Sequence, residues 1–308
     1  MKPKRFHIRN RKGRNQPSGF AWALLVLAWL CVIPFAAYVF APRETKELPD
    51  ERQLQQAFLP VEDVQQAEEQ SIFAQTCILP AMNALRSDEP TILIYHTHTT
   101  EAYTQTDTET YVESSKWRTT DKERNVVAVG EVLKEILEKE YGFHVIHDTT
   151  DHEPPKLATS YDRSLVTLEK YHKEYPSIVL FIDLHRDAYS TENAPCDYLT
   201  INGIETAKMM LVVGKGDKYE DKPYYTSNEA FANRITAHLN AVCPNLCRPV
   251  RIKTGRYNQH VAPNCILVEV GHNANTLSQA KAAMPYLAEA IAYSFRSEAP
   301  PLSDWVPN

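Results

Sequence analysis

Glycine is scarce in this sequence, which holds 9 glycines in 308 residues, about 3% where proteins average ~7%. The chain contains neither GxxxxGK(S/T) nor GxGxxG, the two common glycine-rich patterns that bind phosphate groups. It also lacks HExxH and GxSxG, which mark two common groups of hydrolases. The sequence therefore argues against a phosphate-binding glycine loop and against these two kinds of active site.

Excess positive charge is confined to one end of an otherwise acidic chain. The sequence holds 33 Lys and Arg against 39 Asp and Glu, a formal net charge of −6. Seven of these cations and no acid lie in residues 1–18, which leaves 26 cations against 39 acids in residues 19–308. Because nucleic acids bind proteins mainly through contacts of phosphates with Lys and Arg, we expect no nucleic-acid partner.

An apolar run follows the basic end. Residues 20–40 form 21 consecutive positions without a charged side chain. A helix of this length spans ~30 Å, enough to cross a bilayer, and flanking cations stay on the cytoplasmic side. A buried core helix rarely runs so far without a charge, and the apolar part of a cleaved signal peptide is shorter, ~7–15 residues. We therefore expect a cytoplasmic basic tip (1–18) and a single-pass anchor in the cell membrane (19–41), with the remaining chain outside.

Cysteine does not provide a sulfur-rich metal site. Cys243 and Cys247 form a CxxxC pair around Pro244, for which a local disulfide and two buried free thiols both stay open. No second pair is present to complete a four-sulfur zinc site.

Residues 42–88 are polar and rich in Glu and Gln, which predicts a stalk. A folded domain (89–297) and a short tail (298–308) are expected to follow it. Within the domain, apolar β-branched runs alternate with helical patterns. This alternation predicts an α/β fold with a mostly parallel central sheet flanked by helices. The expected strands are 91–95, 143–147, 177–184, 207–214 and 265–270, and the expected helices are 125–140, 160–173, 228–241 and 276–295.

Residues that can bind a metal ion follow three of the predicted strands. His96 and His98 follow the first strand along the chain. His185 follows the third, and Glu269 lies at the end of the fifth. In open α/β sheets, ligands bind at the carboxyl ends of the strands, and imidazole and carboxylate are the usual ligands of catalytic zinc. The sequence therefore predicts a metal site at this edge of the sheet.

A fourth candidate ligand is Glu123, just before the predicted helix at 125–140. The start of a helix that follows the first strand faces the same edge of the sheet. If a His, Glu, His set bound the metal ion, Glu269 would be free to carry protons. Each residue also has a simpler explanation, since a His after a strand is usually a loop residue and Glu123 suits a helix N-terminus. Glu269, however, interrupts an apolar strand, where an unpaired carboxylate is costly. The coincidence of these residues at one edge favours a metal site.

Five segments resemble the stage II sporulation protein P family, membrane-anchored cell-wall hydrolases of spore-forming bacteria that are related to zinc-dependent N-acetylmuramoyl-L-alanine amidases. The resemblance covers roughly residues 90–295, and the expected N-terminal anchor agrees with it. The segments are ILIYHTHTTEAY (92–103), DKERNVVAVGEVL (121–133), IDLHRDA (182–188), YNQ (257–259) and LVEVGHNANT (267–276).

The resemblance implies a zinc amidase-like fold and a set of site residues. The amidases carry a His after the first strand, a Glu at a helix start, a His at a strand end and a late Glu, which match His98, Glu123, His185 and Glu269. The amidase Gly-His-Gly-Gly is replaced here by His-Thr-His, so His96 is a second candidate beside His98 for the first zinc ligand.

The resemblance also implies hydrolysis of the amide between N-acetylmuramic acid and L-alanine of the peptidoglycan stem peptide. Zinc would activate water, Glu269 would carry the proton to the leaving amine, and Arg186 would help to stabilise the oxyanion. A cross-link endopeptidase activity and partner proteins of sporulation, both membrane proteins and wall-degrading enzymes, are further implications. Two other hypotheses stay open: a catalytically silent, membrane-anchored wall-binding scaffold, and a different zinc peptidase such as a carboxypeptidase.

Overall fold

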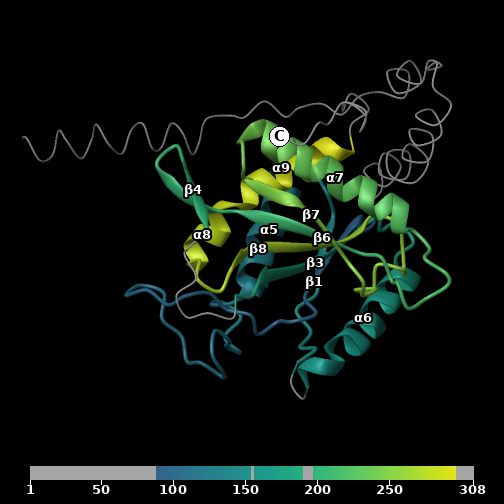
Figure 1. The fold of residues 1–308 in the computed structure, drawn as a ribbon, viewed down its shortest axis with the longest axis horizontal. Coiled ribbons are helices and arrows are strands. Elements are labelled where there is room, and N and C mark those ends of the chain that lie inside the picture. The colour runs from purple at the N-terminus through teal and green to yellow at the C-terminus, as the bar shows by residue number, and fades with distance from the viewer. Residues whose placement is uncertain (1–87, 154–155, 190–196, 296–308) are drawn as a thin grey trace, which may run out of the picture. The chain divides into compact units, whose positions relative to one another are not determined.

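The computed structural model describes residues 88–153, 156–189 and 197–295 of the chain (Figure 1). The predicted basic tip, membrane anchor and tail lie outside the described residues, as does all but the last residue of the predicted stalk. These four assignments therefore stay predictions. Among the residues that the structure describes, no helix is both long and apolar enough to span a membrane.

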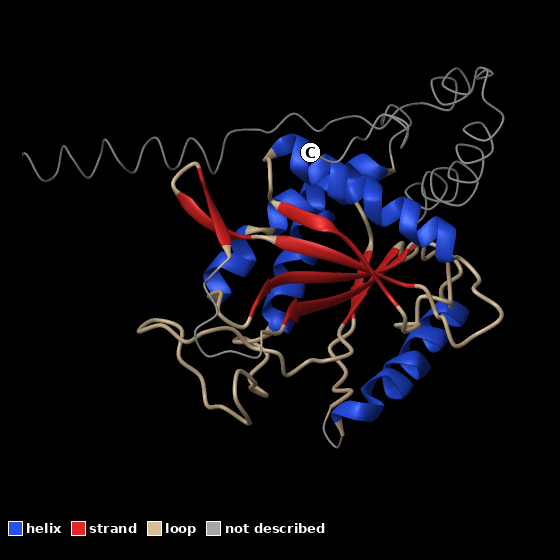
Figure 2. Ribbon diagram, viewed as in Figure 1, coloured by secondary structure: helices blue, strands red, loops and turns tan. Residues whose placement is uncertain are grey.

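A six-stranded sheet forms the centre of the described residues (Figure 2). Its first four strands run parallel, the fifth runs antiparallel to the fourth, and the sixth runs parallel to the fifth. The predicted α/β fold with a mostly parallel sheet is thus confirmed. In order across the sheet, the strands are β2 (Val145–His147), β1 (Ile92–Tyr95), β3 (Leu180–Asp187), β8 (Cys265–His272), β6 (Met209–Gly214) and β7 (Cys247–Lys253).

Helices cover the two faces of the sheet unequally (Figures 1 and 2). Side chains on one face, such as Ile94 and Ile182, belong to a core shared with four helices. Side chains on the other face, such as Leu93 and Phe181, pack with Leu168 of a single helix. The first face carries α5 (Val126–Tyr141), α7 (Tyr225–Val242), α8 (Leu277–Ala282) and α9 (Met284–Ser294), and the second carries α6 (Ser160–Glu174).

Both ends of α5 follow from the local sequence. The side chain of Asn125 accepts a hydrogen bond from the Val127 N–H at 2.9 Å and caps the first turn. Gly142 has a φ of 72°, and its N–H donates to the carbonyl of Glu138 at 3.2 Å. The helix predicted at 125–140 is confirmed, and Gly142 ends it.

The helix predicted at 276–295 is interrupted. It consists of α8 and α9, which meet at Ala283. Pro285 lies at the start of α9, and proline lacks the N–H that a continuous helix needs. The break is therefore a local consequence of one residue.

Three further strands were not predicted: the two strands of a hairpin and one edge strand. A hairpin of β4 (Tyr198–Ile201) and β5 (Ile204–Ala207) turns at Asn202 and Gly203, which have φ values of 51° and 81°. Asn-Gly is the pair that such a turn favours. The other element is the edge strand β7, in which Arg and Lys residues interrupt any apolar pattern.

The cysteines of the described residues are free thiols. Cys243 is half-buried, and Cys247 and Cys265 are buried. Of the two alternatives left open for the CxxxC pair, the structure therefore shows the thiols. Burial raises the pKa of Cys247 to about 11, so this thiol is unreactive at neutral pH.

Helix α5 packs closely against a pair of buried imidazoles. His96 Nδ1 lies 2.8 Å from the Leu184 carbonyl, and His96 Nε2 lies 2.9 Å from His147 Nε2. Because a carbonyl only accepts, His96 carries a proton on Nδ1. A Cβ atom on Gly130 of α5 would lie 2.7 Å from His147 Nε2 and 2.9 Å from His96 Nε2, so only glycine leaves room for this pair.

Substituting Gly130→Ala tests this contact. Alanine normally stabilises a helix interior by roughly 1 kcal/mol relative to glycine, but here we expect a loss of about 1–3 kcal/mol, because the two rings must separate. Thermal unfolding of the full chain in mild detergent measures the change. In a Gly130→Ala, His147→Ala double variant, the added methyl group should cost much less. A Gly130→Ala chain more stable than the wild type would contradict the packing described.

Candidate active site

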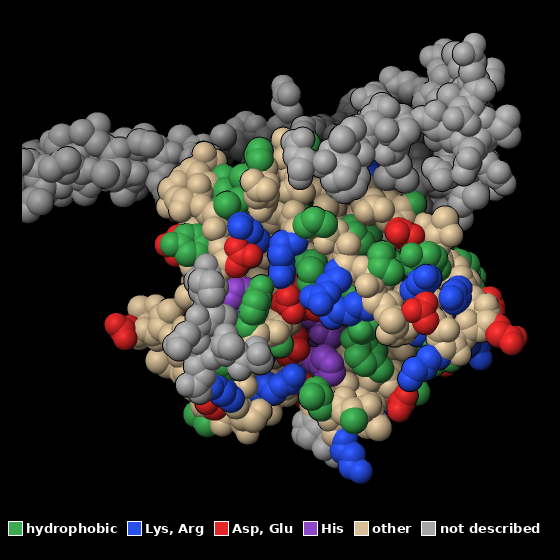
Figure 3. Space-filling model, viewed as in Figure 1, with side chains coloured by type: hydrophobic (Ala, Val, Ile, Leu, Met, Phe, Trp, Pro, Cys, Tyr) green, Lys and Arg blue, Asp and Glu red, His purple; other side chains and the backbone are tan. Residues whose placement is uncertain are grey.

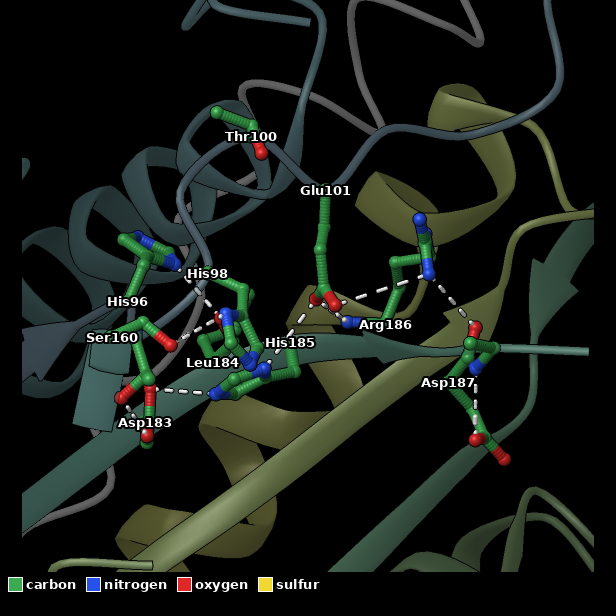
Figure 4. Close-up of polar contacts among 12 residues, drawn as sticks. His96, His98, Thr100, Glu101, Ser160, Asp183, Leu184, His185, Arg186 and Asp187 are labelled. Atoms are coloured by element: carbon green, nitrogen blue, oxygen red, sulfur yellow. Dashed lines mark hydrogen bonds and ion pairs between the residues drawn. The ribbon is translucent and has the colours of Figure 1, made fainter. Parts of the chain in front are cut away.

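Polar side chains gather where β1, β3 and β8 end, and on this face His side chains lie beside acidic and basic ones (Figure 3). His185 of β3 and Glu269 of β8 are direct partners in the parallel register. Residues two apart on a strand point to the same face, so Asp183 shares the α6 side of the sheet with His185. The loop after β1 brings His98 and Glu101 to the same place (Figure 4).

His185 is buried between two carboxylates. Its Nε2 atom lies 2.8 Å from Asp183 Oδ1, and its Nδ1 atom lies 3.4 Å from Glu101 Oε2. Burial alone lowers the pKa of an imidazole, but the charges of Asp183 and Glu101 outweigh it and raise the pKa of His185 well above its usual value. The site therefore stabilises positive charge at His185, as a bound proton when no metal is present.

Asp183 ties the loop after β1 to β3. Its Oδ1 accepts from the Thr97 N–H at 2.8 Å, and its Oδ2 accepts from the Thr97 hydroxyl at 2.6 Å. Burial raises the pKa of Asp183, but His185 and the Thr97 hydrogen bonds outweigh it, and the pKa is lower than usual. These bonds hold the backbone next to His98, so they also orient that side chain.

His98 faces His185, with the two ring centroids 5.2 Å apart. Its Nδ1 lies 3.2 Å from Glu153 Oε2. Because a carboxylate only accepts, Nδ1 carries the proton, and Nε2 keeps the lone pair that a metal ion binds. Glu153 is buried and forms an ion pair with Arg118, which fixes its position behind His98.

Glu101 is the buried carboxylate that faces His185. Its Oε2 accepts from the Arg186 backbone N–H at 3.1 Å, and its Oε1 lies 3.7 Å from Arg118 Nη2 and 3.9 Å from Arg186 Nη1. Burial raises the pKa of Glu101, but the charge of Arg186 and the hydrogen bond with His185 outweigh it and hold the pKa well below its usual value. Glu101 is therefore ionised at neutral pH.

The guanidinium of Arg186 is buried and bonded to backbone carbonyls. Its Nε donates to Ala102 O at 2.8 Å, and its Nη2 donates to Trp117 O at 3.0 Å. Together with the Glu101 contacts, these bonds hold the loop after β1 against β3. The structure thus gives Arg186 a role in positioning Glu101, while its role toward the oxyanion stays a prediction.

Glu269 is buried and has an unused acceptor, since no described residue forms a hydrogen bond with its Oε2. Burial raises its pKa to about 7; His185 opposes the rise, and Glu101 adds to it. A carboxyl group with this pKa takes up and releases a proton at neutral pH. A general acid or base needs this property.

The structure does not bring His96 and Glu123 to this cluster. His96 lies on the α5 side, where its two ring nitrogens contact the Leu184 carbonyl and His147. Glu123 is exposed in the turn before α5, and in the described part of the chain no contact joins its side chain to the cluster. Two residues still separate Glu123 from the first residue of α5, so the helix start does not direct its side chain to the sheet edge. Of the two alternatives His96 and His98, the structure places His98 beside His185, and Glu101, which was not predicted, also faces His185.

Sequence reasoning missed three carboxylates of the cluster. Asp183 lies two residues before His185 in the same strand, and the period of two was sufficient to place both on one face. Glu101 lies within the segment HTHTTEAY, but only the fold of that loop turns it toward His185. Glu153 lies 55 residues from His98, and no local pattern predicts that contact.

The donor chemistry at this edge suits zinc. His98 Nε2, His185 Nδ1 and the Glu101 carboxylate are nitrogen and oxygen donors. A buried carboxylate lies within 3.2 Å of the other nitrogen of each imidazole, a position common behind zinc-bound histidines. The Oε2 atom of Glu269 is buried without a hydrogen-bond partner among the described residues, and a water molecule on a nearby metal ion would supply one. As they stand, no three His, Cys, Asp or Glu side chains of the described residues surround one point closely enough to hold a metal ion.

The family model of stage II sporulation protein P (SpoIIP) matches residues 40–292. The chain belongs to the SpoIIP family. It is also 26% identical over 221 residues to the stage II sporulation protein P of Bacillus subtilis (strain 168), a match that covers 67% of this chain and 51% of that protein. The chain thus aligns with about half the length of this SpoIIP relative.

Solved structures give weaker matches. The N-acetylmuramoyl-L-alanine amidase from Clostridium difficile 630 matches with a TM-score of 0.40 and 13% identity, over 68% of this chain and 95% of the amidase. The CwlD amidase from Clostridioides difficile, solved in complex with the GerS lipoprotein, matches with a TM-score of 0.41 and 15% identity, over 68% of this chain and 95% of CwlD.

Replacing Glu101→Gln tests which carboxylate faces His185. The substitution removes a negative charge next to the imidazole, so we expect the pKa of His185 to fall by about 1–3 pH units in metal-free protein. Glu123→Gln is the matched control and should leave this pKa unchanged. NMR titration of labelled histidine side chains measures both. An equal pKa in wild type and Glu101→Gln would show that Glu101 does not belong to the site.

Proposed function

We propose that this chain is a membrane-anchored peptidoglycan hydrolase of sporulation that cleaves the amide between N-acetylmuramic acid and L-alanine. Membership of the SpoIIP family supports the sporulation context. The observation that carries the chemistry is the pair His185 and Glu269. The imidazole of His185 lies between two carboxylates. Its partner in the strand register, Glu269, is a buried carboxyl group with one oxygen that has no partner among the described residues.

His98, Glu101 and His185 are the residues that would hold a zinc ion in this proposal. Their donors are those of catalytic zinc sites, and the two carboxylates around His185 already favour positive charge there. When bound, zinc supplies a Lewis acid that polarises a carbonyl oxygen and lowers the pKa of water. His96 and Glu123 are not part of this proposed set.

Glu269 is the proton carrier. Its Oε2 accepts no hydrogen bond from the described residues, so it is available to take a proton from the attacking water. The same oxygen then gives this proton to the nitrogen of the leaving L-alanine. A pKa of about 7 suits both transfers, because neither the protonated nor the ionised form dominates at neutral pH.

The loop after β1 orients the site. Arg186 and Arg118 bind Glu101, and Thr97 binds Asp183, so two of the carboxylates around the imidazoles are fixed before substrate arrives. Preorganised groups cost no reorganisation during the reaction.

The location and partners of the chain are also part of the proposal. The apolar run at 20–40 would anchor it in the cell membrane with residues 89–297 outside, where peptidoglycan is accessible. Other membrane proteins and wall-degrading enzymes of sporulation would be its partners. Cleavage of peptide cross-links would be a second activity of the same site.

Digestion of purified peptidoglycan by the full chain in detergent, with zinc or with a chelator, tests this function. Mass spectrometry should find intact stem peptides with a free L-alanine amine, and only when zinc is present. Glu269→Gln should keep stoichiometric zinc and lower kcat by about 10²–10⁴-fold, because only the proton carrier is lost. His185→Ala should lose zinc.

Glu123→Gln is the control for both measurements and should match the wild type in zinc content and turnover. Loss of terminal peptide residues would identify a carboxypeptidase instead. Zinc-loaded protein that binds peptidoglycan without any cleavage would identify a scaffold.

A further inference from the structure

A basic side chain lies in the same row of the sheet as the proposed catalytic residues. In the strand register, His185 pairs with Glu269, Glu269 pairs with Met210, and Met210 pairs with Arg248 of the edge strand β7. Directly paired residues point to the same face of a sheet. Neighbouring strands lie ~4.8 Å apart, so the Arg248 backbone is about 10 Å from that of Glu269.

A β-bulge extends this row into a stripe of three cations, Arg248, Arg251 and Lys253. On β6, Met210 and Val212 are two residues apart, whereas their partners on β7, Arg248 and Arg251, are three apart. In a regular strand, residues three apart point to opposite faces. The extra residue of the bulge instead puts Arg248 and Arg251 on the same face of the sheet, the face that carries Glu269. Lys253 follows two residues later on the same face.

Two of the three cations of the stripe have no carboxylate partner among the described residues. In the described part of the chain, neither Arg251 nor Lys253 has a carboxylate within 4 Å, and Arg251 is exposed. Arg248 Nη1 lies 3.1 Å from Asp187 Oδ2, but its Nε is buried and has no hydrogen-bond partner among the described residues. In a chain with a net charge of −6, this stripe is a local concentration of positive charge.

A buried apolar cluster with a half-buried tyrosine packed against it lies between the stripe and the proposed metal ligands. Met210, Val212 and Leu267 pack with Tyr257 and not with a helix. The ring centroids of Tyr257 and Tyr161 are 5.5 Å apart, and those of Tyr161 and His98 are 5.6 Å apart. Lys and Arg side chains lie beside His and acidic side chains on the face seen in Figure 3. An extended ligand that starts at Glu269 therefore meets the half-buried ring of Tyr257 first and the cations next, since Lys253 Nζ lies 5.9 Å from the centroid of that ring.

We infer that Arg248, Arg251 and Lys253 bind carboxylates of the substrate's peptide on the leaving-group side of the scissile amide. This inference rests on the proposed function. An extended peptide advances ~3.3–3.6 Å per residue, so two to four residues beyond the amide span roughly 7–14 Å, which brackets the distance from Glu269 to the stripe. The stem peptide carries its carboxylates on the residues after L-alanine. Guanidinium groups bind carboxylates in bidentate fashion, which gives the stripe its specificity.

Charge reversal with Arg251→Glu tests the stripe, because Arg251 is exposed and its loss leaves no buried partner. The substrates are a disaccharide-tetrapeptide and the same compound with its peptide carboxylates amidated. With the free acid, Arg251→Glu should raise KM about tenfold or more and change kcat little, since one charged hydrogen bond is worth roughly 1.5–3 kcal/mol. With the amidated compound, the variant and the wild type should have similar KM values.

Two matched variants complete the test. Arg251→Lys keeps the charge and should recover most of the affinity for the free acid. Lys173→Glu makes the same charge reversal on an exposed lysine near the end of α6, outside the stripe, and should behave as the wild type with both compounds. An unchanged KM of Arg251→Glu for the free acid would overturn the inference, even if the hydrolase activity is confirmed.

Calorimetric binding of both compounds to a Glu269→Gln chain separates this inference from the proposed function. Tighter binding of the free acid that is lost in Glu269→Gln, Arg251→Glu would support the stripe even if the wild type cleaves neither compound. Equal affinity of Glu269→Gln for the free and amidated compounds would overturn the stripe, whatever the outcome of the cleavage assay.

Discussion

The contact of His185 with two buried carboxylates is the interaction on which the rest of this site depends. Asp183 lies on the same strand and Glu101 comes from the loop after β1, so the contact joins two segments distant in sequence. Two negative charges around a buried imidazole would be unfavourable without a compensating positive charge. A proton on His185 supplies that charge in the metal-free protein, and a divalent ion is the natural competitor for the same place.

The surrounding hydrogen bonds serve this contact. Thr97 holds Asp183, and Arg186 holds Glu101 through its backbone N–H while its guanidinium binds loop carbonyls. On the opposite face of the sheet, His96 binds the carbonyl of Leu184, the residue next to His185, and Gly130 leaves room for this imidazole. The strand ends are thus fixed from both faces.

Much of the fold could be predicted because its signals are local. Apolar β-branched runs placed β1, β3 and β8, and a helical pattern at 125–140 placed α5. The strand-end rule then predicted a cluster of His96 or His98 with His185 and Glu269, and the structure places His98 beside His185. Glu101 was not predicted, because its direction depends on how the loop after β1 folds over β3. Glu123 was chosen for its place before α5, but the turn there leaves its side chain exposed.

The measurement that tests the account most directly is anomalous diffraction at the zinc edge from crystals of the zinc-loaded protein. The account predicts one strong peak in contact with His98 Nε2, His185 Nδ1 and the Glu101 carboxylate, with Glu269 near enough to share a water molecule with the ion. A peak at His96 or Glu123, or crystals grown with excess zinc that show no peak beside His185, would contradict it.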